Sequence, residues 1–115
     1  MVSEDIETRA RETGVKYLEL IGCEILDEDY SGFVVAEDTD CVVFAGIDVE
    51  VGEFREFGDE DSKMLVMEFE RAMIEFFSEC SVEPDVKVRL DKICVAVVSN
   101  SRAVLKHYVN VCNER

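Results

Sequence analysis

Two acidic residues of this chain could act together on a metal ion, because Asp48 and Glu50 alternate with valines in the apolar segment 41–51. This segment is predicted to be a β-strand, in which residues two apart share one face. Both carboxylates would then point to the same side of a sheet, where Asp38 or Asp40 could approach and complete a divalent-cation site. Solvated acids at the end of a strand are the alternative interpretation of the same residues.

A second group of oxygen ligands lies in residues 27–38, which read DEDYSGFVVAED. The donors alternate as in an EF-hand-like calcium loop, and Gly32 stands where such a loop turns sharply. The flanks disagree, because Gly22 interrupts the entering helix and the segment after residue 40 is strand-like. An acidic turn between two strands explains the same pattern, with Asp and Ser accepting local hydrogen bonds. The hypothesis is a weak Ca²⁺ site whose candidate ligands are Asp27, Asp29, Ser31 and Asp38.

The net charge of −15 is unevenly distributed along the chain. Residues 1–61 hold 19 acids and 4 bases, whereas residues 62–115 hold 8 of each. The acidic half repels phosphate backbones, so nucleic-acid binding is disfavoured. It either keeps the protein soluble or faces a basic protein or cations. A nucleic-acid surface would have to come from the neutral half, through Lys87, Arg89, Lys92, Arg102 and Lys106.

Cysteine usage and hydropathy suggest a cytoplasmic protein without a membrane segment. The five cysteines, at 23, 41, 80, 94 and 112, form no CxxC pair, and a single histidine makes a zinc site unexpected. Cys41 and Cys94 lie in apolar runs, where a free thiol usually packs as a small core side chain. No apolar run reaches the ~20 residues of a membrane span, and the acidic N-terminus lacks the features of a signal peptide.

The periodicity predicts one α/β domain over residues 1–115, in the order αβββαβββ. A helix is expected over 4–21, capped by Ser3 and ended by Gly22, and a second over 63–79, capped by Asp61 or Ser62. The apolar stripe of the second helix is Leu65, Phe69, Ala72, Met73, Phe76 and Cys80. The expected strands are 24–26, 33–36 and 41–51, then 86–90, 93–99 and 104–109, with polar turns at 27–32 and 37–40. These elements should form a sandwich around a mixed sheet.

Four phrases of the sequence carry a family resemblance. They are TGVKYLELIGCEIL at 13–26, DTDCVVFAGID at 38–48, RLDKICVAV at 89–97 and HYVNVC at 107–112. In order and spacing they resemble the YraN family of predicted nucleases, whose phrases are A-x-x-Y-L-x-x-x-G-x-x-I-L, D-G-D-T-L-V-F-V-E-V-K, R-F-D-V-V-x-V-V and H-I-x-N-A-F. Members are relatives of archaeal Holliday-junction resolvases. The resemblance covers nearly the whole chain and implies a restriction-endonuclease-like three-layer sandwich, a mixed central sheet flanked by two main helices.

The chain departs from this family at the residues of the reaction. The family's chemistry is expected from G-E-I-D in one strand and E-x-K in the next, where two acids hold Mg²⁺ or Mn²⁺ and the lysine orients the nucleophile. Aligned through Phe44, the second motif reads Gly46-Ile47-Asp48, so glycine replaces the acid and aspartate replaces the lysine. In the first motif the metal-binding Asp becomes Phe33 or Val35.

The family's lysine-rich helix is also replaced, by a segment whose only cations are Lys63 and Arg71. We therefore expect a nuclease-like domain without catalysis or cofactor that works through protein contacts, with a protein partner or a second copy as a homodimer. Two alternatives remain open. One is a metal-dependent endonuclease or nucleic-acid binder with a shifted site at Asp48 and Glu50, and the other is Ca²⁺ binding by residues 27–38.

Overall fold

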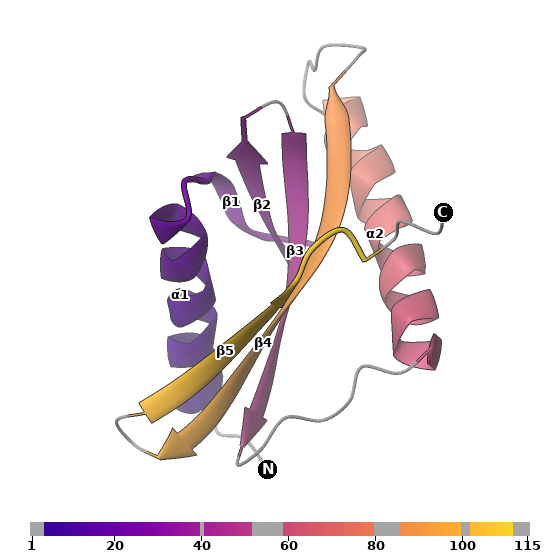
Figure 1. The fold of residues 1–115 in the computed structure, drawn as a ribbon. Helices are drawn as coiled ribbons and strands as arrows, with labels where there is room; N and C mark the ends of the chain where they lie inside the picture. The colour runs from indigo at the N-terminus through magenta and orange to yellow at the C-terminus, as the bar shows by residue number, and fades with distance from the viewer. Residues whose placement is uncertain (1–3, 40, 52–58, 80–85, 100–101, 112–115) are drawn as a thin grey trace.

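The computed structural model describes residues 4–39, 41–51, 59–79, 86–99 and 102–111. Two helices and five strands follow one another in the order αβββαββ (Figure 1). They are α1 (Glu4–Leu20), β1 (Glu24–Tyr30), β2 (Phe33–Asp38), β3 (Cys41–Val51), α2 (Asp59–Glu79), β4 (Lys87–Ser99) and β5 (Arg102–Tyr108).

The five strands form one mixed sheet in which spatial order follows chain order. All neighbouring strands are antiparallel except β3 and β4, which run parallel and in register from Cys41 opposite Lys87 to Val51 opposite Val97. A parallel pair needs a crossover, and α2 supplies it. Figure 1 shows α1 and α2 on opposite sides of the sheet. The expected sandwich of a mixed sheet between two helices is thus confirmed at this level.

Strand alternation divides the core into two clusters, one under each helix. On the α1 face, Leu18 packs with Ile93 and Val95. On the α2 face, Phe44 makes edge-to-face contacts with Phe69 and Phe76, with ring centroids 5.5 and 5.6 Å apart. The described part of the stripe predicted for the second helix is confirmed as buried or partly buried, and Cys80 lies outside the described residues.

The end of α1 follows from its glycine. Gly22 has a φ of 102°, its N–H donates to the Glu19 carbonyl at 3.1 Å, and the Cys23 N–H donates to the Leu18 carbonyl at 2.9 Å. These are the two bonds of a Schellman motif, and Leu18 and Cys23 belong to one cluster as its hydrophobic contact. The predicted helix and its stop are confirmed, whereas the Ser3 cap lies outside the described residues.

A second glycine lets α1 approach the sheet closely. A Cβ on Gly14 would lie only 2.7 Å from Ile47 Cδ1. The helix backbone therefore rests almost directly on an isoleucine of β3, and alanine would not fit unless that side chain moved.

Predicted boundaries of two strands in the first half are wrong. Strand β2 continues to Asp38 instead of ending at residue 36, so residues 37 and 38 pair with β3 and are not in the turn predicted at 37–40. Strand β1 continues to Tyr30 instead of ending at residue 26, and the turn is confined to Ser31 and Gly32. Both residues have positive φ, 52° and 90°, which is the geometry of a two-residue hairpin whose twist matches the strands. The acids of β1 were taken for turn residues because this strand lies at the sheet edge, where polar side chains remain exposed.

The second half also differs from expectation. Segments 86–90 and 93–99 form one thirteen-residue strand, β4, because Asp91 and Lys92 are buried strand residues and not a break. Helix α2 begins at Asp59 instead of residue 63, so Asp61 and Ser62 do not cap it. Neither helix, as far as the structure describes them, is long and apolar enough to cross a membrane.

Candidate functional site

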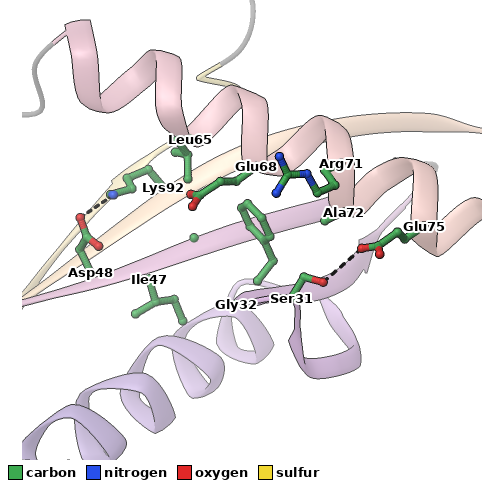
Figure 2. A pocket seen from close by; sticks show the side chains of 12 residues that line it. Ser31, Gly32, Ile47, Asp48, Leu65, Glu68, Arg71, Ala72, Glu75 and Lys92 are labelled. Carbon is green, nitrogen blue, oxygen red and sulfur yellow. Dashed lines mark hydrogen bonds and ion pairs between the residues drawn. The ribbon is translucent and has the colours of Figure 1, made fainter.

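A cavity of about 480 Å³ opens on the α2 face of the sheet, where β2, β3, β4 and α2 meet. Strand register produces this meeting point, because Phe33 of β2 lies opposite Gly46 of β3, and Gly46 lies opposite Lys92 of β4. The lining comprises Ser31, Gly32, Phe33, Gly46, Ile47, Asp48, Leu65, Glu68, Arg71, Ala72, Glu75 and Lys92 (Figure 2).

Apolar packing surrounds the facing positions Phe33 and Gly46 of β2 and β3. Phe33 is buried and meets Phe44 edge to face, with ring centroids 6.1 Å apart. At Gly46 a Cβ would lie 3.1 Å from Leu65 Cδ1 and 3.7 Å from Phe33 Cε1. Any side chain here would require the Leu65 methyl to shift by a few tenths of an ångström. The absence of a side chain at residue 46 therefore suits this packing.

The polar part of the cavity is built around an ion pair. Lys92 Nζ lies 2.5 Å from Asp48 Oδ2, and the lysine side chain is 8% exposed whereas the aspartate side chain is 45% exposed. Figure 2 shows the two side chains pointing toward each other from adjacent strands. An ammonium group taken out of water needs such a partner, so Asp48 offsets the burial of Lys92. The aspartate of β3 is thus held against a lysine from the next strand.

Helix α2 covers the other side of the cavity with alternating charges. Glu68, Arg71 and Glu75 come from successive turns and line it together. Glu75 also ties the helix to the first hairpin, because Ser31 Oγ donates to its Oε1 at 3.4 Å. The cavity therefore holds three carboxylates and two cations within a small volume.

The described acids of the shifted metal site proposed for the third strand do not come together. Asp38 lies opposite Cys41, seven residues along β3 from Asp48, which is ~23 Å at the usual rise of a strand. It contacts Arg89 Nη1 at 3.5 Å instead, and Asp40 lies outside the described residues. Glu50 shares the face of Asp48 but does not line the cavity. Among the described residues no group of three or more His, Cys, Asp and Glu could hold a metal ion.

The calcium-loop residues are likewise drawn out along a hairpin. Asp27 and Asp29 lie on β1, Ser31 in the turn, and Asp38 at the far end of β2. Two of the carboxylates accept local backbone hydrogen bonds, Asp27 from the Asp29 N–H at 2.9 Å and Asp29 from the Gly32 N–H at 3.1 Å. Asp29 also contacts Arg11 at 3.5 Å. The residues thus behave as the acidic hairpin alternative, and their oxygens do not surround one point.

The five predicted nucleic-acid cations do not form one surface. Two of them are engaged in partly or largely buried ion pairs, Lys92 with Asp48 and Arg89 with Asp91. Lys87 begins β4, whereas Arg102 of β5 lies opposite Ser99 at the other end of β4, ~40 Å away by the strand rise. Lys106 Nζ lies over the Tyr108 ring, 5.7 Å from its centroid.

A buried polar network on the α1 face was missed by sequence reasoning. Asp91 is fully buried and accepts hydrogen bonds from Arg89 Nε at 2.8 Å, Arg89 Nη2 at 3.0 Å and the Asn110 N–H at 2.9 Å. His107 Nε2 lies 2.7 Å from its second oxygen, and His107 Nδ1 lies 2.8 Å from the Tyr17 hydroxyl. A carboxylate only accepts, so Nε2 carries the proton and, in the neutral ring, the tyrosine hydroxyl donates to Nδ1.

This network sets the protonation of its members. Burial alone would raise the pKa of Asp91, but hydrogen bonds from His107, Arg89 and the Asn110 amide outweigh it and hold the pKa below its usual value. The signal was the pair Arg89 and Asp91, opposite charges two residues apart that share one face of a strand. Those charges were taken as a break between two strands.

Two cysteines lie near the network and a third near the cavity. Burial raises the pKa of Cys23 and Cys41, and the carboxylates of Asp38 and Asp91 raise it further. Burial likewise raises the pKa of Cys94. All three remain thiols at neutral pH, as expected for cysteines that serve as packing groups.

No protein-family model matches this chain, and no curated protein matches it with significant similarity.

Proposed function

We propose that this chain is a restriction-endonuclease-like domain that has lost metal-dependent phosphodiester cleavage and acts through protein contacts. The element order αβββαββ, with a parallel β3–β4 pair joined through α2, is compatible with that fold. The YraN-like phrases at 13–26, 38–48, 89–97 and 107–112 support the same assignment.

One observation carries the loss of catalysis. Gly46 stands at the position of one motif acid, and buried Phe33 or Val35 at that of the other. Phe33 lies opposite Gly46 and packs in one apolar cluster with Leu65. The third position, Asp48, is neutralised by Lys92. A nuclease of this type needs two carboxylates on one cation to generate hydroxide and stabilise the phosphorane, and the described cavity lacks that pair on the strands.

The test is a cleavage assay on four-way-junction, nicked and linear duplex DNA with Mg²⁺ or Mn²⁺. We expect no products above those of the metal alone, from wild type or from Asp48→Asn. A restriction-endonuclease-like enzyme expressed in parallel controls for the substrates. Metal-dependent cleavage by wild type that Asp48→Asn abolishes would contradict the proposal.

A second candidate is a nuclease with a rearranged site. The lysine missing from β3 is replaced in space by Lys92, whose amine lies beside Asp48 in a cavity that Glu68 also lines. Such an enzyme would lose cleavage in both Lys92→Met and Glu68→Gln. The matched control is Glu70→Gln, an exposed acid of the same helix that does not line the cavity.

A further inference from the structure

A second groove lies on the α1 face, between the first half of α1 and the β4–β5 hairpin. Its volume is about 350 Å³, and its apolar lining includes Ile6, Ala10, Val95 and Val97. The charged residues that line it are two arginines, Arg9 and Arg102, and no acid is among its described lining residues. In a chain of net charge −15 this groove therefore has the opposite electrostatic character to the surface as a whole.

A β-bulge directs Arg102 into this groove. Val97 lies opposite Ala103 and Ser99 opposite Arg102, so β4 has one extra residue, Val98, between the two pairs. Consecutive strand residues normally point to opposite faces, yet both Arg102 and Ala103 line the groove. Bulges re-aim side chains in this manner, and here the bulge adds a guanidinium beside an apolar floor.

The groove borders the edge of the sheet. Within the described part of the chain β5 is the last strand, and its pairing with β4 is regular from Tyr108 to Ala103. The opposite edge strand, β1, is interrupted by two register shifts. An uninterrupted edge strand presents a row of backbone N–H and C=O groups that can pair with another extended chain.

The charges of the two edges differ in sign. Strand β5 carries Arg102 and Lys106 and no acid, whereas β1 carries four acids and no base. Four strand spacings of ~4.8 Å separate the edges by ~19 Å, which exceeds the ~8 Å Debye length at physiological salt. The acids of β1 are therefore largely screened at β5, where Arg102 is the charged β5 residue that lines the groove.

We propose that the β5 edge and the adjoining groove bind an extended segment of a partner protein in which acidic residues alternate with apolar ones. This inference rests on the proposed function and names the kind of partner. Backbone pairing with β5 supplies affinity, apolar side chains enter the groove above Val95 and Val97, and carboxylates meet Arg102. The cations of the edge disfavour pairing with a second copy of β5, because like charges would face each other.

The experiment measures binding of nine-residue synthetic peptides to the full chain at 0.15 M salt. Three peptide sets alternate valine or isoleucine with Asp/Glu, with Lys/Arg, or with Ser/Gln. We expect selective binding of the acidic set, weakened about tenfold by Arg102→Glu, since an attractive pair becomes a repulsive one. Lys87→Glu makes the same change in net charge at the far end of β4 and should leave affinity within about twofold.

Backbone methylation of the peptide tests the edge directly. Methyl groups on alternate nitrogens remove either the N–H groups that face β5 or those that face solvent, so one methylated peptide should fail to bind and the other should bind normally. Equal binding of all three sets, no binding of the acidic set, or equal effects of Arg102→Glu and Lys87→Glu would each overturn the proposal. So would sedimentation showing that the chain assembles with itself and that Arg102→Glu abolishes this assembly.

The cleavage assay separates this inference from the proposed function. Absence of both peptide binding and DNA cleavage would overturn this partner and leave the non-catalytic assignment intact. Metal-dependent cleavage that is lost in Asp48→Asn would overturn the proposed function whatever the peptides do.

Discussion

Replacement of Asp91 by alanine should cost this protein a large part of its stability. The side chain is fully buried and accepts hydrogen bonds from both nitrogens of the Arg89 fork, from His107 and from the Asn110 N–H. Removal of one partner of a buried ion pair typically costs about 3–5 kcal/mol, because the other charge is left buried and uncompensated.

The structure places the expected cost near the lower end of that range. The Arg89 side chain is 21% exposed and keeps Asp38 at 3.5 Å, so its charge retains some water and a second carboxylate. We therefore expect a loss of about 3 kcal/mol. For 115 residues the entropy of unfolding is about 0.24 kcal/mol per kelvin, so the midpoint should fall by about 12 °C.

Urea and thermal unfolding followed by circular dichroism would measure this loss. The matched control is Asp29→Ala, which removes a 73% exposed carboxylate also 3.5 Å from an arginine, Arg11, and should cost at most about 1 kcal/mol. If the two variants lost equal stability, the buried network around Asp91 would contribute no more to the free energy of unfolding than an exposed ion pair.

Three further predictions concern the pKa of Asp91, two buried thiols and the contact of Gly14 with Ile47. The pKa of Asp91 is lowered in the folded state, so its contribution to stability is complete above the unfolded value of about 4 and is lost as the pH falls through the folded pKa. Asp91→Asn should therefore make the free energy of unfolding less dependent on pH in the acid range. An unchanged pH dependence would refute this. Cys23 and Cys94 are buried thiols with raised pKa, so iodoacetamide at pH 8 should modify them only after the protein unfolds. Peptide mass mapping would measure the modification. Rapid labelling of the folded protein would contradict their burial. Gly14→Ala should destabilise the wild-type protein, because the new Cβ would clash with Ile47 Cδ1. In an Ile47→Val background that methyl group is gone, so Gly14→Ala should stabilise by up to about 1 kcal/mol through the helix propensity of alanine. Additive effects in the double-mutant cycle would argue against the close contact.

The fold was largely predictable from periodicity. Strand 41–51 and the end of α1 at Gly22 follow directly from an apolar run and a glycine stop. The errors arose where burial and polarity disagree. Strand β1 was shortened because acids on an edge strand resemble a turn. Strand β4 was divided because Asp91 and Lys92 are charged yet buried, with partners that include the distant residues His107 and Asp48.

The candidate site was predictable only in part. The resemblance led us to expect departures from nuclease motifs at Phe33 or Val35, at Gly46 and at Asp48, which stay predictions. The sequence could not supply Lys92 as the partner of Asp48. That contact depends on the parallel register of β3 and β4, which no local pattern specifies. Asp38 was misplaced because the antiparallel pairing of β2 with β3 sets it opposite Cys41, far along β3 from Asp48.

Thermal unfolding in EDTA, Mg²⁺, Mn²⁺ and Ca²⁺ tests the loss of the metal site most directly. A cation at ~100 times its dissociation constant would stabilise the folded state by about 2.7 kcal/mol, which raises the midpoint of this domain by about 10 °C. We expect each protein, wild type, Asp48→Asn or Asp29→Asn, to unfold at the same midpoint temperature in all four conditions. The substitutions themselves can shift the midpoint of one protein relative to another. A rise of several degrees with Mg²⁺ or Mn²⁺ that disappears in Asp48→Asn would contradict this expectation.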